Sequence, residues 1–189
     1  GLELEVLAVD TELLKEARSH YEGLELLRLA GDTSLAPARA LLAHALRENL
    51  DDSLERVFRL LGLRYPPRDI FHIYQNVVNA RAARRSSALE LLDNLLEPRL
   101  KELVLPMVDA PSMEAAIETG RELLHLPPPS EGLGPILRSS DCWIRAVALY
   151  LVGEERLVVY RGAVSEALRD PDPLVRVEAE RALARLEAA

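Results

Sequence analysis

The sequence predicts an all-α protein of about ten short helices in antiparallel succession. Apolar residues recur at steps of three and four along nearly the whole chain, and no segment sustains the two-residue alternation typical of a strand. Leu, Ala, Glu and Arg dominate, all of which favour helix, while aromatic residues make up only 4%. With 189 residues, 49% of them hydrophobic, the chain can bury one sizeable core or a short array of repeats.

Glycine and proline divide this pattern into separate segments. Gly31 is expected to end the first helix, and Pro66 and Pro67 begin a later one, since proline is tolerated in a first helical turn. In this part of the chain, helices are expected over residues 11–29, 34–62, 66–80, 83–96, 99–109 and 112–126.

The main break in the chain lies at residues 127–135, which hold four prolines and two glycines. Such a segment predicts an inter-helix loop, or a weak boundary within one domain that spans residues 1–189. After the break, helical segments are expected over residues 133–139, 140–153, 154–170 and 173–186.

Two of these C-terminal segments repeat one another. Asp141-Cys-Trp-Ile-Arg145-Ala-Val-Ala matches Asp172-Pro-Leu-Val-Arg176-Val-Glu-Ala at an offset of 31 residues, which suits a two-helix repeat. A third copy is expected at RAARRSSALELL, where Arg85 is in register with the two arginines and Arg81 replaces the aspartate.

Each position of this repeat has a physical purpose. The aspartate can cap the helix by accepting from its free amides, and the aliphatic residue before the arginine faces the core. The alanine, two turns on from the aspartate, lets helices approach closely. The arginine can reach a carboxylate of a neighbouring repeat. We therefore expect a structural ladder, meaning a series of equivalent polar contacts that joins successive repeats. Its members are Arg85, Asp141, Arg145, Asp172 and Arg176.

The C-terminal form DPDPLVRVEAERALARL resembles the HEAT repeat, including the variant called PBS-lyase-like. This resemblance implies an α-solenoid of HEAT-like antiparallel helix pairs, in which each pair buries its apolar face against the next. The stretches ALRENLDDSLERVFRLLGLRYPPRDI, SSALELLDNLLEPRLKELVLPMVD and DCWIRAVALYLVG are similar to the soluble HEAT region of bacterial proteins with an ATP/ADP-translocase-like membrane domain. That second resemblance implies a cytosolic part of a larger membrane protein.

The net charge of the chain and its local distribution indicate which classes of partner the protein could bind. The formal net charge of −8 argues against nucleic acid, whose binding requires a positive surface. Residues 64–85 differ, with five arginines against one aspartate. The candidate binding residues of this stretch are Arg64, Arg68, His72, Arg81 and Arg84. They could bind a protein, anionic lipid or nucleic acid, or they could pair with the acidic flanks of the same chain.

Motifs for chemistry are not evident. The four histidines are scattered without the spacing of metal ligands, and there is no phosphate-binding glycine loop. Cys142, the only cysteine, is expected to be a tolerated small residue at a helix start rather than a nucleophile. The N-terminus lacks a basic segment typical of a signal peptide, and no apolar run approaches the roughly 20 residues of a membrane helix.

These observations favour a cytoplasmic, non-enzymatic interaction or scaffold module without cofactor or metal. Its expected partner is a protein or another domain of the same polypeptide. One alternative is a nucleic-acid or anionic-lipid binding module on the same scaffold, which would use residues 64–85. The other alternative is a HEAT protein associated with a lyase-like enzyme.

Overall fold

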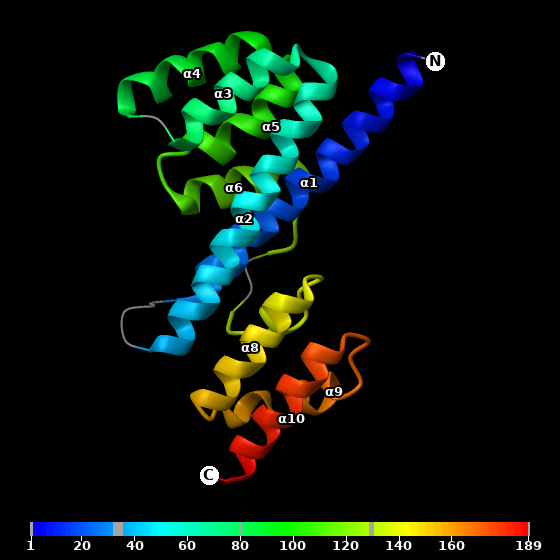
Figure 1. The fold of residues 1–189 in the computed structure, drawn as a ribbon, viewed down its shortest axis with the longest axis vertical. Helices are drawn as coiled ribbons and strands as arrows, with labels where there is room; N and C mark the ends of the chain where they lie inside the picture. The colour runs from blue at the N-terminus through cyan, green and yellow to red at the C-terminus, as the bar shows by residue number, and fades with distance from the viewer. Residues whose placement is uncertain (1, 32–35, 80, 129–130, 189) are drawn as a thin grey trace. The chain divides into compact units, whose positions relative to one another are not determined.

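The computed structural model describes residues 2–31, 36–79, 81–128 and 131–188, with side chains from residue 7 onward. Within these ranges it contains ten α-helices, one short 3-10 helix and no strand, so the predicted all-α class is confirmed (Figure 1). The elements are α1 (Leu2–Ala30), α2 (Pro37–Arg64), α3 (Pro67–Asn79), α4 (Ala82–Leu95), α5 (Pro98–Asp109), α6 (Met113–Leu124), α7 (Gly134–Leu137), α8 (Cys142–Glu154), η1 (Val158–Tyr160), α9 (Arg161–Ala167) and α10 (Pro173–Glu187).

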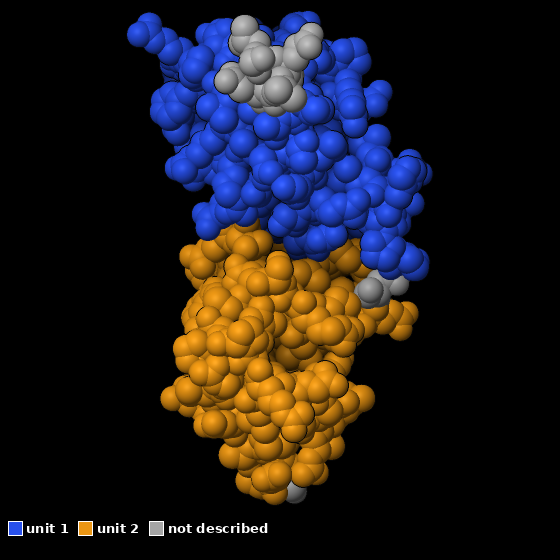
Figure 2. Space-filling view, turned by 90° about the vertical axis from the view of Figure 1, so that its right-hand side faces the viewer, with its two compact units in different colours: residues 1–24, 50–128 blue, residues 25–49, 129–189 orange. Residues whose placement is uncertain are grey.

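The helices form two compact units, which Figure 2 colours separately. Unit 1 comprises residues 1–24 and 50–128, and unit 2 comprises residues 25–49 and 129–189. The chain passes from one unit to the other at three points, which we call crossings. The crossing after residue 128 lies inside the predicted break at 127–135. The other two crossings lie within α1 and α2, where the apolar spacing continues without a break.

Two helix boundaries differ from expectation. Helix α1 begins at Leu2 rather than at residue 11, because lengthening an existing helix adds one backbone hydrogen bond per residue without a new nucleation cost. The predicted helix over 154–170 is instead a turn followed by η1 and α9, because Arg156 adopts φ 51° and ends the run of α8. The expected start of the second helix at Ser34 lies outside the described residues; the helix is described from Pro37.

The core of unit 1 draws apolar side chains from α1 to α6, with Tyr21 at its centre. Tyr21 is fully buried, and its hydroxyl donates to the Leu103 carbonyl at 2.8 Å. A Cβ on Gly120 would lie 2.2 Å from Cγ of Tyr21, so only glycine lets α6 approach α1 this closely. Burial also raises the pKa of the Tyr21 hydroxyl.

The core of unit 2 is centred on α8. Ile144, Ala148, Leu151 and Val152 are buried, and the residues packed around them come from α7, α9, α10 and the parts of α1 and α2 that belong to this unit. Helix α8 is therefore apolar on most of its circumference, as expected for the central helix of a unit.

His20 is a buried titratable side chain in unit 1, only 4% exposed. Burial lowers its pKa to about 4, against a weaker opposing effect of a hydrogen bond with the Leu50 backbone. Its Nδ1 has no hydrogen-bond partner among the described residues. The neutral imidazole packs edge-on against the Tyr21 ring, with ring centroids 6.1 Å apart.

The pKa of His20 predicts a pH dependence of stability. The pKa of histidine is near 6.5 in the unfolded chain and about 4 for His20 in the folded chain. Between these two values, the unfolded chain binds a proton at His20 that the folded chain does not bind. The contribution of His20 is therefore complete above pH 6.5 and falls as the pH is lowered, by about 2 kcal/mol between pH 7.5 and pH 5. Urea unfolding at both pH values measures the loss. The His20→Leu variant should lose correspondingly less, and equal losses in the two proteins would contradict the prediction.

Candidate interaction surfaces

A groove of about 750 Å³ lies between α3 and α4 of unit 1. Apolar side chains line its floor, including the buried Ile73 and Ala88, together with Leu95 and Leu91, which is 60% exposed. Its polar lining residues are Asp69, His72 and Asn76 on α3 and Arg84 and Ser87 on α4. We call these nine residues and Ala83 the α3–α4 groove.

Helical periodicity explains this lining. Asp69, His72 and Asn76 are spaced by three and four residues, which places them on one face of α3. Ser87 and Leu91 follow Arg84 at the same kind of spacing on α4. The groove is therefore formed by one continuous face from each helix.

Two of the five predicted binding residues, His72 and Arg84, line the groove. Arg64 does not line it. Its guanidinium donates to Asp10 and, at 2.6 Å, to Glu97, and these hydrogen bonds, with that to Asp10 the stronger effect, raise its pKa. The intramolecular alternative thus applies to Arg64.

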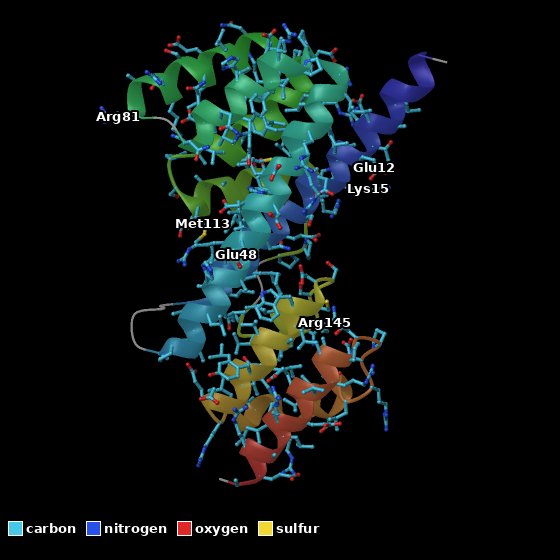
Figure 3. All side chains as sticks on the ribbon, viewed as in Figure 1. Glu12, Lys15, Glu48, Arg81, Met113 and Arg145 are labelled. Carbon is cyan, nitrogen blue, oxygen red and sulfur yellow. The ribbon has the colours of Figure 1, made fainter. Side chains whose placement is uncertain are left out.

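The other two predicted residues, Arg68 and Arg81, are exposed and lie outside the groove lining. Arg81 occupies the N-cap position of α4 without capping it through its side chain, and Figure 3 labels it at the start of that helix. Within the described ranges, neither these two arginines nor Arg84 forms a hydrogen bond or ion pair with a carboxylate. Three cationic side chains thus remain available on or beside α3 and α4.

Arg85 plays a different part from its neighbours. It is half-buried, and its guanidinium donates to the carbonyl of Val77, at 3.3 Å, and to that of Val108. It therefore bonds carbonyls near the C-terminal ends of α3 and α5, without reaching a carboxylate. In this copy of the repeat, the arginine therefore donates to carbonyls at helix C-termini. The sequence alone does not show whether a repeat arginine will bond carbonyls or a carboxylate.

Asp69, His72 and Ser87 bring to one groove the residue types of an acyl-transfer triad. Sequence reasoning missed this combination because the three come from two helices with no motif spacing. The Ser87 hydroxyl donates to the Ala83 carbonyl at 3.3 Å, and no hydrogen bond joins the three side chains in the described part of the chain. A nucleophilic serine needs such a bond to its base, and the three described side chains do not form one.

In unit 2, the two aspartates of the repeat occupy N-cap positions. Asp141 accepts from the amides of Trp143, at 2.8 Å, and Ile144, at 3.2 Å, at the start of α8. Asp172 accepts from the amide of Leu174 at 2.8 Å at the start of α10. Both aspartates thus satisfy amides that have no partner within their helix.

The two arginines of the repeat also share a geometry. Arg145 points from α8 towards the loop before α10 (Figure 3). Its Nε and Nη2 each donate a hydrogen bond of 2.9 Å to a carboxylate oxygen of Asp170. Its Nη1 donates to the carbonyls of Ser139 and Ser140. The hydrogen bond from Arg145 holds the pKa of the Asp170 carboxyl below its usual value. This bidentate pair links one repeat to the next.

Cys142 lies at the first position of α8, beside the second capping aspartate. The hydrogen bond to Asp172 is the main effect that raises the pKa of the Cys142 thiol. A thiol with a raised pKa holds less thiolate at neutral pH, and the thiolate is the nucleophile. The raised pKa therefore makes the Cys142 thiol a weaker nucleophile at neutral pH.

Comparison with protein-family models, with curated proteins and with solved structures finds no match for this chain. Among the described residues, no three histidine, cysteine or carboxylate side chains gather as a metal site. None of the described helices combines the length and apolar character needed to cross a membrane.

Proposed function

We propose that the protein is a non-enzymatic interaction module, built from HEAT-like helix pairs that stack as a solenoid. Its α3–α4 groove binds an amphipathic helix with acidic residues, supplied by a protein partner or by another part of the same polypeptide. The observation that carries this proposal is the apolar floor, with Leu91 60% exposed, beside arginines that have no carboxylate partner among the described residues.

The repeat in unit 2 supports the solenoid part of the proposal. The N-cap aspartate, the arginine one turn on and its two carbonyl acceptors recur in α8 and α10 at the same spacing. Repeats held by the same contacts stack with a constant relation to one another, which is the basis of a solenoid. Proteins with such an arrangement commonly act by presenting an extended surface to a binding partner rather than by catalysis.

The lining of the groove selects the occupant. Leu91, Leu95 and Ile73 offer apolar surface along neighbouring helices, which suits residues spaced by three and four on a partner helix. Arg84 lines the same groove without an ion pair to a described carboxylate, so an acidic side chain next to the apolar face of the occupant would neutralise it. Leu91 belongs to a contiguous apolar lining, and an apolar patch with a charged rim is typical of a docking surface.

Selection from a displayed library of amphipathic helical peptides tests the proposal, with the full 189-residue chain as the target. Enriched peptides should combine an apolar face with acidic residues. Their dissociation constants, measured by fluorescence anisotropy, should rise at least about tenfold with Arg84→Glu or Leu91→Asp, the loss expected of one central contact. The matched control is Arg47→Glu, which changes an exposed arginine on α2 outside the groove lining.

Three outcomes would contradict the proposal. Peptides enriched without acidic residues would remove the role of Arg84. Peptides whose affinity survives both groove variants would place binding elsewhere. Binding of phosphatidylserine vesicles or of single-stranded DNA, lost in Arg84→Glu and not matched by any peptide, would favour the lipid or nucleic-acid alternative.

A further inference from the structure

Helix α10 leaves exposed a stripe of residues that its counterpart α8 keeps covered. At the 31-residue offset, the covered residues of α8 are Ala146, Leu149 and Gly153, all buried, and the half-buried Tyr150. Their equivalents on α10 are Val177, Glu180, Arg181 and Ala184, all exposed. The inward positions agree, because Ile144 and its equivalent Val175 are both buried. The face that is covered on α8 is therefore exposed on α10.

On α8, part of this stripe is where α10 packs. A Cβ on Gly153 would lie 3.0 Å from Cα of Ala182, and the Arg185 guanidinium lies 5.6 Å from the ring centroid of Tyr150. The residue of α10 equivalent to Gly153 is Ala184, which is also small. Small residues at a crossing point allow two helix backbones to approach. Helix α10 thus repeats, on its outer face, the shape that receives a helix on α8.

Arg176 repeats the geometry of Arg145 with half of its guanidinium left open. Its Nη1 donates to the carbonyls of Asp170, at 2.7 Å, and Pro171, at 2.9 Å. In Arg145, Nη1 likewise bonds two carbonyls, while Nε and Nη2 donate to the Asp170 carboxylate. In Arg176 those two groups have no hydrogen-bond acceptor among the described residues. The half-buried side chain is thus already fixed in an orientation that suits a carboxylate.

We propose that this end of unit 2 is a docking surface for a protein partner that carries a helix pair of the same repeat type. The loop of that helix pair presents an aspartate to Nε and Nη2 of Arg176, as Asp170 does to Arg145. The helix that follows packs on Val177, Arg181 and Ala184. Charge complementarity at Arg176 and the small residue Ala184 define the partner. The site is independent of the α3–α4 groove.

A grafted copy of the chain's own repeat serves as the probe. The extended chain consists of residues 1–186 followed by a second copy of residues 156–187, which preserves the 31-residue register and brings a copied Asp170 to Arg176. Circular dichroism and thermal unfolding compare it with the original chain. We expect added helical signal and a melting temperature higher by about 3 °C or more.

A double-mutant cycle then isolates the proposed contact. Arg176→Gln should lower the melting temperature of the extended chain at least twice as much as that of the original chain. Changing the copied Asp170 to asparagine should remove that excess, which tests the pair even if one single variant folds poorly. Equal effects of Arg176→Gln in both chains, or no added helical signal, would overturn the proposal. Self-association of the original chain in sedimentation, abolished by Val177→Glu, would also overturn it, because the occupant would then be a second copy.

Discussion

The Gly120→Ala variant is expected to lower the unfolding free energy by about 3 kcal/mol. The added Cβ would lie 2.2 Å from both Cγ and Cδ1 of Tyr21, close to the point where that side chain leaves the backbone. Tyr21 cannot rotate away cheaply, because it is fully buried and its hydroxyl is bonded to the Leu103 carbonyl. The gain in helix propensity, about 1 kcal/mol, offsets only part of this overlap. Urea unfolding followed by circular dichroism measures the loss.

Gly162→Ala is the matched control for this substitution. Gly162 lies in α9 with no heavy atom within 4 Å of an added Cβ, so alanine there should stabilise slightly through helix propensity alone. In a Tyr21→Ala background, two of the three clashing atoms are absent, and Gly120→Ala should cost much less. The explanation fails if Gly120→Ala and Gly162→Ala change stability alike.

Arg145→Ala is expected to cost about 2 kcal/mol, less than the typical loss for a fully buried ion pair, because this pair is half-buried. The side chains of Arg145 and Asp170 are 15% and 12% exposed. Without the guanidinium, the Asp170 carboxylate loses both charged donors, and the carbonyls of Ser139 and Ser140 lose theirs. The free energy of unfolding in urea at pH 7.5 gives the measurement.

Arg176→Ala provides the comparison for Arg145→Ala. It removes two hydrogen bonds to carbonyls and no bidentate ion pair, so we expect a smaller loss of about 1 kcal/mol. The order of the two losses is the informative result. Unchanged stability in both variants would refute the ladder, and a larger loss for Arg176→Ala would contradict the ranking drawn from the structure.

Much of the fold was accessible from sequence because its signals are local. Helix periodicity and proline positions predicted the separate helices, and Asp141 and Asp172 stand at the helix starts that they cap. The split into two units was not accessible. Two of its three crossings lie inside α1 and α2, and a continuous helix carries no local mark where its residues change from one core to another.

The candidate site was predictable only in part. The excess of arginines over residues 64–85 pointed to α3 and α4, and His72 and Arg84 line the groove between them. The ion pairs of Arg64 join it to Asp10 and Glu97, which are distant in the sequence, so its neutralisation needs the tertiary structure. Leu91 appeared to be one more apolar residue of a helix, and only its exposure makes it part of a surface.

The division of each unit between two stretches of chain constrains how such a gene can change. Residues 25–49 and 129–189 build unit 2, while residues 1–24 and 50–128 build unit 1. A single recombination event transfers one uninterrupted stretch from its crossover point onward, so it cannot exchange either unit whole. Replacement of one unit would require several coordinated crossovers, two of them within helices. The units are therefore expected to be inherited together, and shuffled together, as one cassette.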